Sequence, residues 1–158
     1  MRPTVIKPQI WQRWREAHRL VLLAAFEDST TGMRVKEFCQ RLSRELGSDC
    51  QLIEHVWLFN TFRLRELQEI AAEEASASDL VIISTYRTGT LPDEVKGWID
   101  LWLQQRARQP AILLTLLDTD YEGASNAVEA YLQKAARRGS MEFLVGSGEV
   151  PDIRWPSR

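Results

Sequence analysis

The stretch from Ser78 to Trp102 constrains the fold more than any other part of the chain. It contains Leu80–Ile83, a short and wholly apolar run that is typical of a strand covered on both faces. A polar loop follows over Ser84–Pro92, and a helix is predicted to begin after Pro92, a residue that the first turn of a helix tolerates. A buried strand that feeds a helix through a polar loop is typical of an open α/β sheet, in which ligands bind beside such loops.

The helix after Pro92 has a wide apolar face. Its members are spaced three and four residues apart, which predicts burial, and they are Val95, Trp98, Ile99, Trp102 and Leu103. We expect this face to extend beyond what one sheet covers. The sequence therefore predicts a homodimer that uses this helix or the N-terminal segment with Trp11 and Trp14. Alternatively, those two tryptophans cover a face of their own domain.

Apolar runs elsewhere predict further strands, separated by segments with helical spacing. The expected strands are Leu20–Phe26, Gln51–Leu58, Leu80–Ile83, Ala111–Leu117 and Met141–Val145. The helix after the second strand is expected to be capped by Asn60 or Thr61 and to run to about Ala75. Strands that alternate with helices form a parallel sheet with right-handed crossovers.

We therefore predict an α/β fold with three layers, a doubly wound five-stranded parallel sheet of order 2-1-3-4-5. The 158 residues divide into an N-terminal arm over 1–19, one domain over 20–146 and a C-terminal tail over 147–158. In this order the crossovers change direction between the first and third strands. The loops Asp28–Gly32 and Ser84–Leu91 then lie side by side, with Asp118–Gly123 next to them, and any ligand is expected there.

Two stretches resemble flavin-binding proteins. The first, Ser29-Thr30-Thr31-Gly32-Met33-Arg34, resembles the phosphate-binding loop [ST]-x-T-G-x-[TS] of the flavodoxin-like family, with Arg34 in place of the last hydroxyl. The second, Gly89–Asp100, is similar to the strand–loop–helix of NADPH-dependent reductases of flavin mononucleotide (FMN). The resemblance implies a flavodoxin-like protein that binds FMN as a reductase or electron carrier.

The resemblance also implies roles for individual residues. The phosphate would contact Ser29, Thr30, Thr31 and Gly32, and Arg34 would pair with it. Tyr86 would stack on the isoalloxazine ring, and the backbone of Arg87, Thr88 and Gly89 would meet its polar edge. The flavin would supply the electron chemistry and the protein would tune it.

Acidic residues around the same loops leave other interpretations open. Asp118 and Asp120, with Glu27 at an earlier strand end, resemble the magnesium site of Toprim domains. A receiver domain has the same fold, but here Ser84-Thr85 stands where its phosphoacceptor aspartate would be. A cofactor-free relative that serves regulation or protein interaction fits these partial motifs equally well.

Composition excludes several classes of function. With 44% hydrophobic and 27% charged residues and a net charge of −2, the chain is typical of a globular protein and has no basic groove for nucleic acid. The absence of a signal peptide and of long apolar runs predicts a cytoplasmic protein without membrane contact. Cys39 and Cys50 are expected as buried thiols, and His18 and His55 as structural residues.

Overall fold

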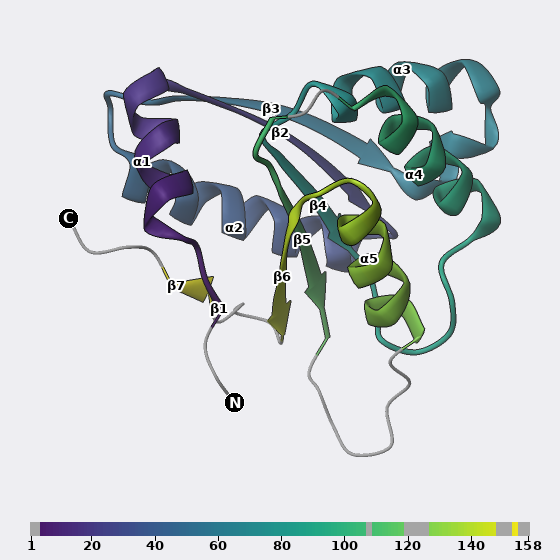
Figure 1. Ribbon diagram of the computed structural model, residues 1–158. Coiled ribbons are helices and arrows are strands. Elements are labelled where there is room, and N and C mark those ends of the chain that lie inside the picture. The colour runs from purple at the N-terminus through teal and green to yellow at the C-terminus, as the bar shows by residue number, and fades with distance from the viewer. Residues whose placement is uncertain (1–3, 107–108, 119–126, 148–152, 155–158) are drawn as a thin grey trace.

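A parallel sheet with strand order β3-β2-β4-β5-β6 forms the centre of the molecule (Figure 1). The computed structural model describes residues 4–106, 109–118, 127–147 and 153–154. The strands are β2 (Arg19–Phe26), β3 (Gln51–Leu58), β4 (Leu80–Ser84), β5 (Ile112–Leu117) and β6 (Glu142–Ser147). Every neighbouring pair in this sheet is parallel. The predicted fold class and strand order are confirmed.

Helices cover both faces of the sheet, as predicted. Residues of α1 (Pro8–Ala17) and α2 (Ser29–Leu46) pack on one face, whereas α3 (Arg65–Ser76), α4 (Asp93–Gln105) and α5 (Ala127–Arg138) pack on the other (Figure 1). The interior strand β2 alternates between these layers: Leu22 and Ala24 face α1 and α2, and Leu23 and Ala25 face the other helices. Because both faces are covered, β4 and β5 are buried along their whole length.

The predicted face of α4 is buried within its own chain at Val95, Trp98, Ile99 and Trp102, and Leu103 is half-buried. Trp98 and Trp102 are both 0% exposed, and the ring of Trp98 stacks on Phe62 with the ring centroids 4.6 Å apart. Trp11 and Trp14 on α1 are also buried, at 5% and 2% exposure, in the layer between α1, α2 and the sheet. The tryptophans on which the sequence based its homodimer prediction are therefore buried, and those of the arm belong to the core.

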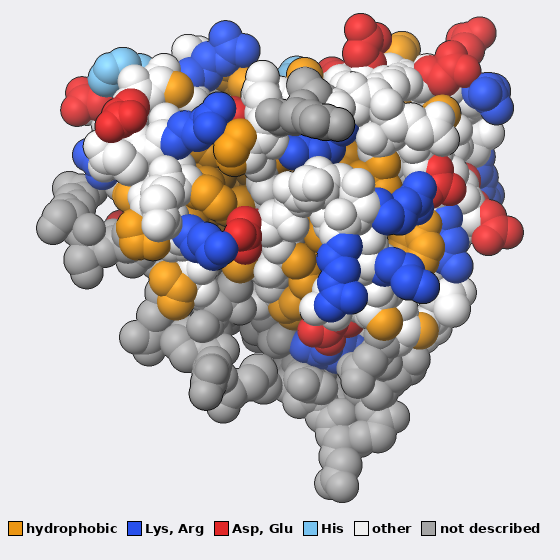
Figure 2. All heavy atoms as spheres, in the orientation of Figure 1, with side chains coloured by type: hydrophobic (Ala, Val, Ile, Leu, Met, Phe, Trp, Pro, Cys, Tyr) orange, Lys and Arg blue, Asp and Glu red, His pale blue; other side chains and the backbone are white. Residues whose placement is uncertain are grey.

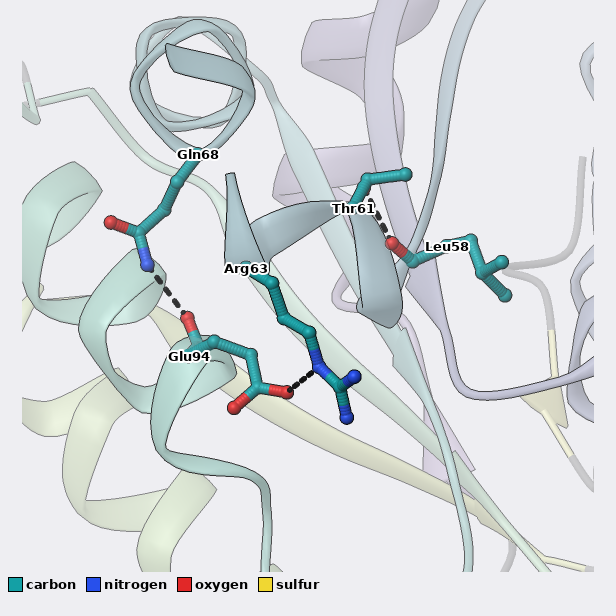
Figure 3. Close-up of polar contacts among 5 residues, drawn as sticks. All are labelled: Leu58, Thr61, Arg63, Gln68 and Glu94. Carbon is teal, nitrogen blue, oxygen red and sulfur yellow. Dashed lines mark hydrogen bonds and ion pairs between the residues drawn. The ribbon is translucent and has the colours of Figure 1, made fainter. Parts of the chain in front are cut away.

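The connection from β3 to α3 differs from its prediction. A 3₁₀ helix, η1 (Phe59–Arg63), comes first, and α3 begins only at Arg65 without a side-chain cap. The predicted cap Thr61 instead donates from its hydroxyl to the carbonyl of Leu58, at 2.6 Å. Figure 3 shows how this turn meets α4: Arg63 Nε lies 3.3 Å from Glu94 Oε1. The side chain of Gln68 from α3 also donates to the carbonyl of Glu94, at 2.9 Å.

Two short strands lie outside the predicted elements. β1 (Thr4–Val5) pairs in parallel with β7 (Ile153–Arg154), so segments from the two ends of the chain meet beside the main sheet (Figure 1). Cys39 and Cys50 are buried free thiols, as predicted, and burial raises the pKa of both. Within the described ranges, no helix has the length and apolar character that crossing a membrane requires.

Candidate functional site

The carboxyl ends of β2 and β4 lie side by side, where the sequence predicted the ligand site. Phe26 at the end of β2 is in register with Ser84 at the end of β4. After β2 the chain crosses through α2 to β3 on one side of this point. After β4 it crosses through α4 to β5 on the other side. This is the topological switch point of the sheet, the place where open α/β folds bind ligands.

The predicted phosphate loop is folded into a helix. Only Glu27 and Asp28 separate β2 from α2, and Ser29 to Gly32 form the first turn of α2. Asp28 is the N-cap residue, and its Oδ1 accepts a hydrogen bond of 2.9 Å from the backbone N–H of Thr31. The helix N-terminus, which carries partial positive charge, is therefore capped by a carboxylate of the chain itself.

The backbone N–H and the hydroxyl of Thr31 both form hydrogen bonds within the same cap. Its side chain is buried, and its Oγ1 accepts hydrogen bonds from the backbone N–H groups of Glu27 and Asp28, each at 2.9 Å. The buried hydroxyl of Ser84 donates to the carbonyl of Thr31 at 2.8 Å, which ties β4 to α2. Gly32 has a packing role, because a Cβ atom there would lie 3.0 Å from the ring of Phe26. Ser29 and Thr30 are exposed.

Tyr86 reaches across from the loop after β4 to this cap. Its hydroxyl donates to Oδ2 of Asp28 at 2.7 Å, so the carboxylate is held from two elements. The backbone N–H of Thr31, and less strongly the hydroxyl of Tyr86, hold the pKa of Asp28 below its usual value against the opposing effect of desolvation. The same hydrogen bond to Asp28 raises the pKa of Tyr86.

Arg34 lies next to this pair. Its guanidinium carbon lies 5.7 Å from the centroid of the Tyr86 ring, a cation–π distance. Its Nη1 is buried and has no hydrogen-bond acceptor within the described part of the molecule. Arg34 is thus the one predicted phosphate partner with a buried donor atom that no acceptor in those ranges uses.

Arg87 is a structural residue of the second loop. It is 3% exposed, its backbone N–H donates to Oδ1 of Asp118 at 2.7 Å, and its Nε donates to the carbonyl of Asp118 at 3.1 Å. Its Nη1 also donates to Glu129 on α5 at 3.2 Å. Thr88 and Gly89 are exposed, and Gly89 has a φ of +84°, which favours glycine.

The acids of the predicted magnesium site have other partners. Glu27 accepts from the hydroxyl of Thr85 at 3.2 Å, and Asp118 holds the backbone of Arg87. Within the described ranges no three His, Cys, Asp or Glu side chains are grouped as metal ligands. Asp120, the third acid of the predicted site, lies outside those ranges.

Asp28, Thr85 and Glu129 take part in the hydrogen bonds at the switch point, although the sequence did not identify them as site residues. Asp28 did carry a signal, because an Asp followed three residues later by a hydroxyl residue has the spacing of a reciprocal N-terminal cap. Glu129 carried none, since it is separated from Arg87 by 42 positions in the sequence.

The residues present do not fit the phosphate of FMN, the cofactor that this fold implies. A phosphate needs free backbone N–H groups and hydroxyls at the first loop. Here the N–H of Thr31 is bonded to Asp28, the Oγ1 of Thr31 is used by two backbone groups, and the carboxylate of Asp28 adds a negative charge. A dianion at this point would be repelled by Asp28 and would have to displace the cap.

Comparisons with known proteins identify no family: no protein-family model and no curated protein matches the chain. Among solved structures, the Trp repressor binding protein from Bacillus subtilis is similar over 83% of this chain and 85% of its own, with 13% identity and a TM-score of 0.49. The two-electron reduced flavodoxin of Megasphaera elsdenii is similar over 84% of this chain and 89% of its own, with 10% identity and a TM-score of 0.48. The order and direction of its own strands give this chain the flavodoxin-like fold.

Proposed function

We propose that this chain is a cofactor-free member of the flavodoxin-like fold that acts through protein contacts. The observation that carries the proposal is the carboxylate of Asp28, held by Thr31 and Tyr86 at the N-terminus of α2. It provides the negative charge that a bound phosphate would otherwise supply there. The switch point then serves to connect α2, β2 and β4.

Exposed apolar side chains support a role in protein contacts. Val56 and Leu58 on β3 are 54% and 36% exposed, and Met33 on α2 is 52% exposed. In the described sheet, β3 is an edge strand of eight residues that pairs only with β2. It contains no proline or lysine, and Glu54 is its one exposed charged residue, so the edge has little of the protection that commonly prevents pairing. We call β3 with its outward side chains Val56 and Leu58 the β3 edge.

The occupant that we infer for the β3 edge is a second copy of the chain. An edge strand can pair with its own copy around a two-fold axis, and the two sheets then continue as one. The same side chains, Val56 and Leu58, would be buried in both copies. The proposed homodimer keeps the predicted partner and places it on a different surface from α4 and the arm.

FMN binding with a reductase role is the second candidate function. Arg34 favours it, because an anion near Tyr86 would give its buried Nη1 the acceptor that the described residues do not supply. In this alternative, a ligand displaces Tyr86 from Asp28 and the cap opens.

Titration with FMN, followed by flavin fluorescence, distinguishes the two candidates. We expect no saturable quenching with the wild-type protein. The Asp28→Ser variant, which keeps a neutral cap, is expected to bind FMN weakly if the carboxylate is what excludes it. Saturable binding by wild type that Arg34→Gln weakens would reject the cofactor-free proposal. Lys36→Gln, an exposed change on the same helix, is the matched control.

A further inference from the structure

A groove of about 850 Å³ lies at the opposite end of the sheet from the switch point. It is bounded by the start of α1, by the C-terminal ends of α4 and α5, and by the residues that precede β5 and β6. In Figure 2, hydrophobic side chains are visible in a hollow left of centre, between α1 and the α5 side of the molecule. Its volume is within the range of sites for small organic ligands.

The floor of this groove is apolar and its rim is cationic. Ile10 and Met141 are each 8% exposed, and Leu103 is half-buried beside them. The charged lining residues are three cations and one anion: Lys7, Arg106, Arg138 and Glu142. The groove is therefore positive, whereas the whole chain carries a net charge of −2.

Two of the three cations already have carboxylate partners. Lys7 Nζ lies 2.5 Å from Glu142 Oε1, and Arg138 Nη1 lies 2.9 Å from Asp100 Oδ1. Both of these pairs are solvent-exposed to a substantial degree, so each side chain can turn toward a ligand at small cost.

Arg106 is different, because its charge is not neutralised in the described part of the chain. Its Nε donates to the carbonyl of Gly139 at 3.1 Å and its Nη2 to the carbonyl of Gln109 at 2.5 Å. Within those ranges no carboxylate lies within ion-pair distance of it, and no hydrogen bond uses its Nη1. Its burial lowers its pKa, which reflects the cost of an unpaired charge there.

These contacts also fix the guanidinium in one orientation. Two carbonyls from different segments hold it, so little side-chain entropy remains to be lost when an anion binds to Nη1. A half-buried and oriented guanidinium above an apolar floor fits a molecule with an anionic group at one end and hydrocarbon at the other.

We propose that this groove binds a small organic anion, with its carboxylate or phosphate group on Arg106 and its apolar body on Ile10, Leu103 and Met141. Lys7 completes the anion site from the rim. The site is separate from the switch point, and it needs no change at Asp28 or Tyr86. It would make the domain responsive to a ligand independently of FMN.

The test uses three probes with the same eight-carbon chain: octanoate, octyl phosphate and octanol. Binding is measured by NMR from the Nε–Hε signal of Arg106 and the methyl signal of Met141. We expect saturable shifts of both signals with at least one of the two anions, and binding of octanol at least about tenfold weaker. Whichever anion binds more tightly identifies the head group as carboxylate or phosphate.

Variants then assign the binding to the groove. Arg106→Gln is expected to weaken anion binding at least about tenfold, whereas Arg63→Gln, on the exposed η1 turn, is expected to leave it unchanged. If loss of the Gly139 and Gln109 contacts unfolds the first variant, Lys7→Gln provides the same test, because it makes the rim less positive without changing a buried group. Equal affinity for octanol and the anions, or unchanged affinity in the folded variant, would overturn the proposal.

Discussion

At the scale of single residues, Asp28 occupies the N-terminus of α2, where a phosphate loop would bind its anion. The run Ser29-Thr30-Thr31-Gly32 predicted a phosphate loop because it offers hydroxyls and a glycine before a helix. The same residues also make a good first helical turn when a carboxylate precedes them, and that is the arrangement in the structure. Local sequence cannot separate these outcomes, since both use the same N–H groups and differ only in which anion binds them.

Asp28 should make stability depend on pH in a specific direction. Its pKa is lowered in the folded state, so its contribution is present above the unfolded value of about 3.9 and is lost as pH falls through the folded value. The Asp28→Asn variant keeps a cap but has no charge. We expect it to be less stable than wild type by about 0.5–1 kcal/mol at neutral pH.

Urea unfolding of both proteins at neutral pH and near pH 3 measures this difference. The difference in unfolding free energy between wild type and the Asp28→Asn variant should be smaller at the lower pH. A difference that stays constant between the two conditions would show that the charge of Asp28 does not stabilise α2.

At the scale of elements, the 3₁₀ turn η1 docks α4 onto the rest of the domain. Phe59 and Phe62 are both buried, and they are three residues apart, a spacing that places side chains on one side of a 3₁₀ helix. The sequence predicted the buried face of α4 correctly because its spacing extends over several turns. It did not predict η1, because a single pair of aromatics is too short a pattern to distinguish a 3₁₀ turn from the start of an α-helix.

The stacked rings of Phe62 and Trp98 should be energetically coupled. Trp98→Ala is expected to cost about 3–5 kcal/mol, because the side chain is fully buried and leaves a cavity. Phe62→Ala combined with Trp98→Ala should cost less than the sum of the single changes by about 0.5–1.5 kcal/mol. Urea unfolding of wild type, the two single variants and the double variant measures this coupling. Leu64→Ala is the control, because the Leu64 side chain is 62% exposed. Strict additivity would mean that the stack contributes nothing beyond burial.

At the scale of the whole molecule, the strand order could be predicted because each central strand is a continuous apolar run between segments of helical spacing. The same patterns could not predict which end of the sheet, the carboxyl ends or the amino ends of the strands, carries a groove. At the predicted site at the carboxyl ends, Tyr86 donates a hydrogen bond to Asp28, whereas the groove at the amino ends is formed by Lys7, Arg106 and other residues that are far apart in sequence. No local pattern brings such residues together.

Self-association through the β3 edge is a property of the whole molecule. We expect light scattering to show a dimer at high protein concentration and a monomer for Val56→Lys, because a lysine on an edge strand opposes pairing. Ile70→Lys, on the exposed side of α3, is the matched control and should remain a dimer. A wild-type protein that stays monomeric would remove the β3 edge as the interface, and would not bear on the hydrogen bonds of Asp28 at the switch point.

The pairing of β1 with β7 has a consequence for the order of folding during synthesis. Thr4 lies opposite Ile153, so β1 acquires its strand partner only after the segment of nearly 150 residues between them, which includes the whole central sheet, has been made. Contacts between residues so distant in sequence form late, because closing a long loop costs entropy. Until then β1 has no strand partner, and a nascent chain stalled before β7 would hold a complete central sheet beside a β1 strand that is still open to other partners.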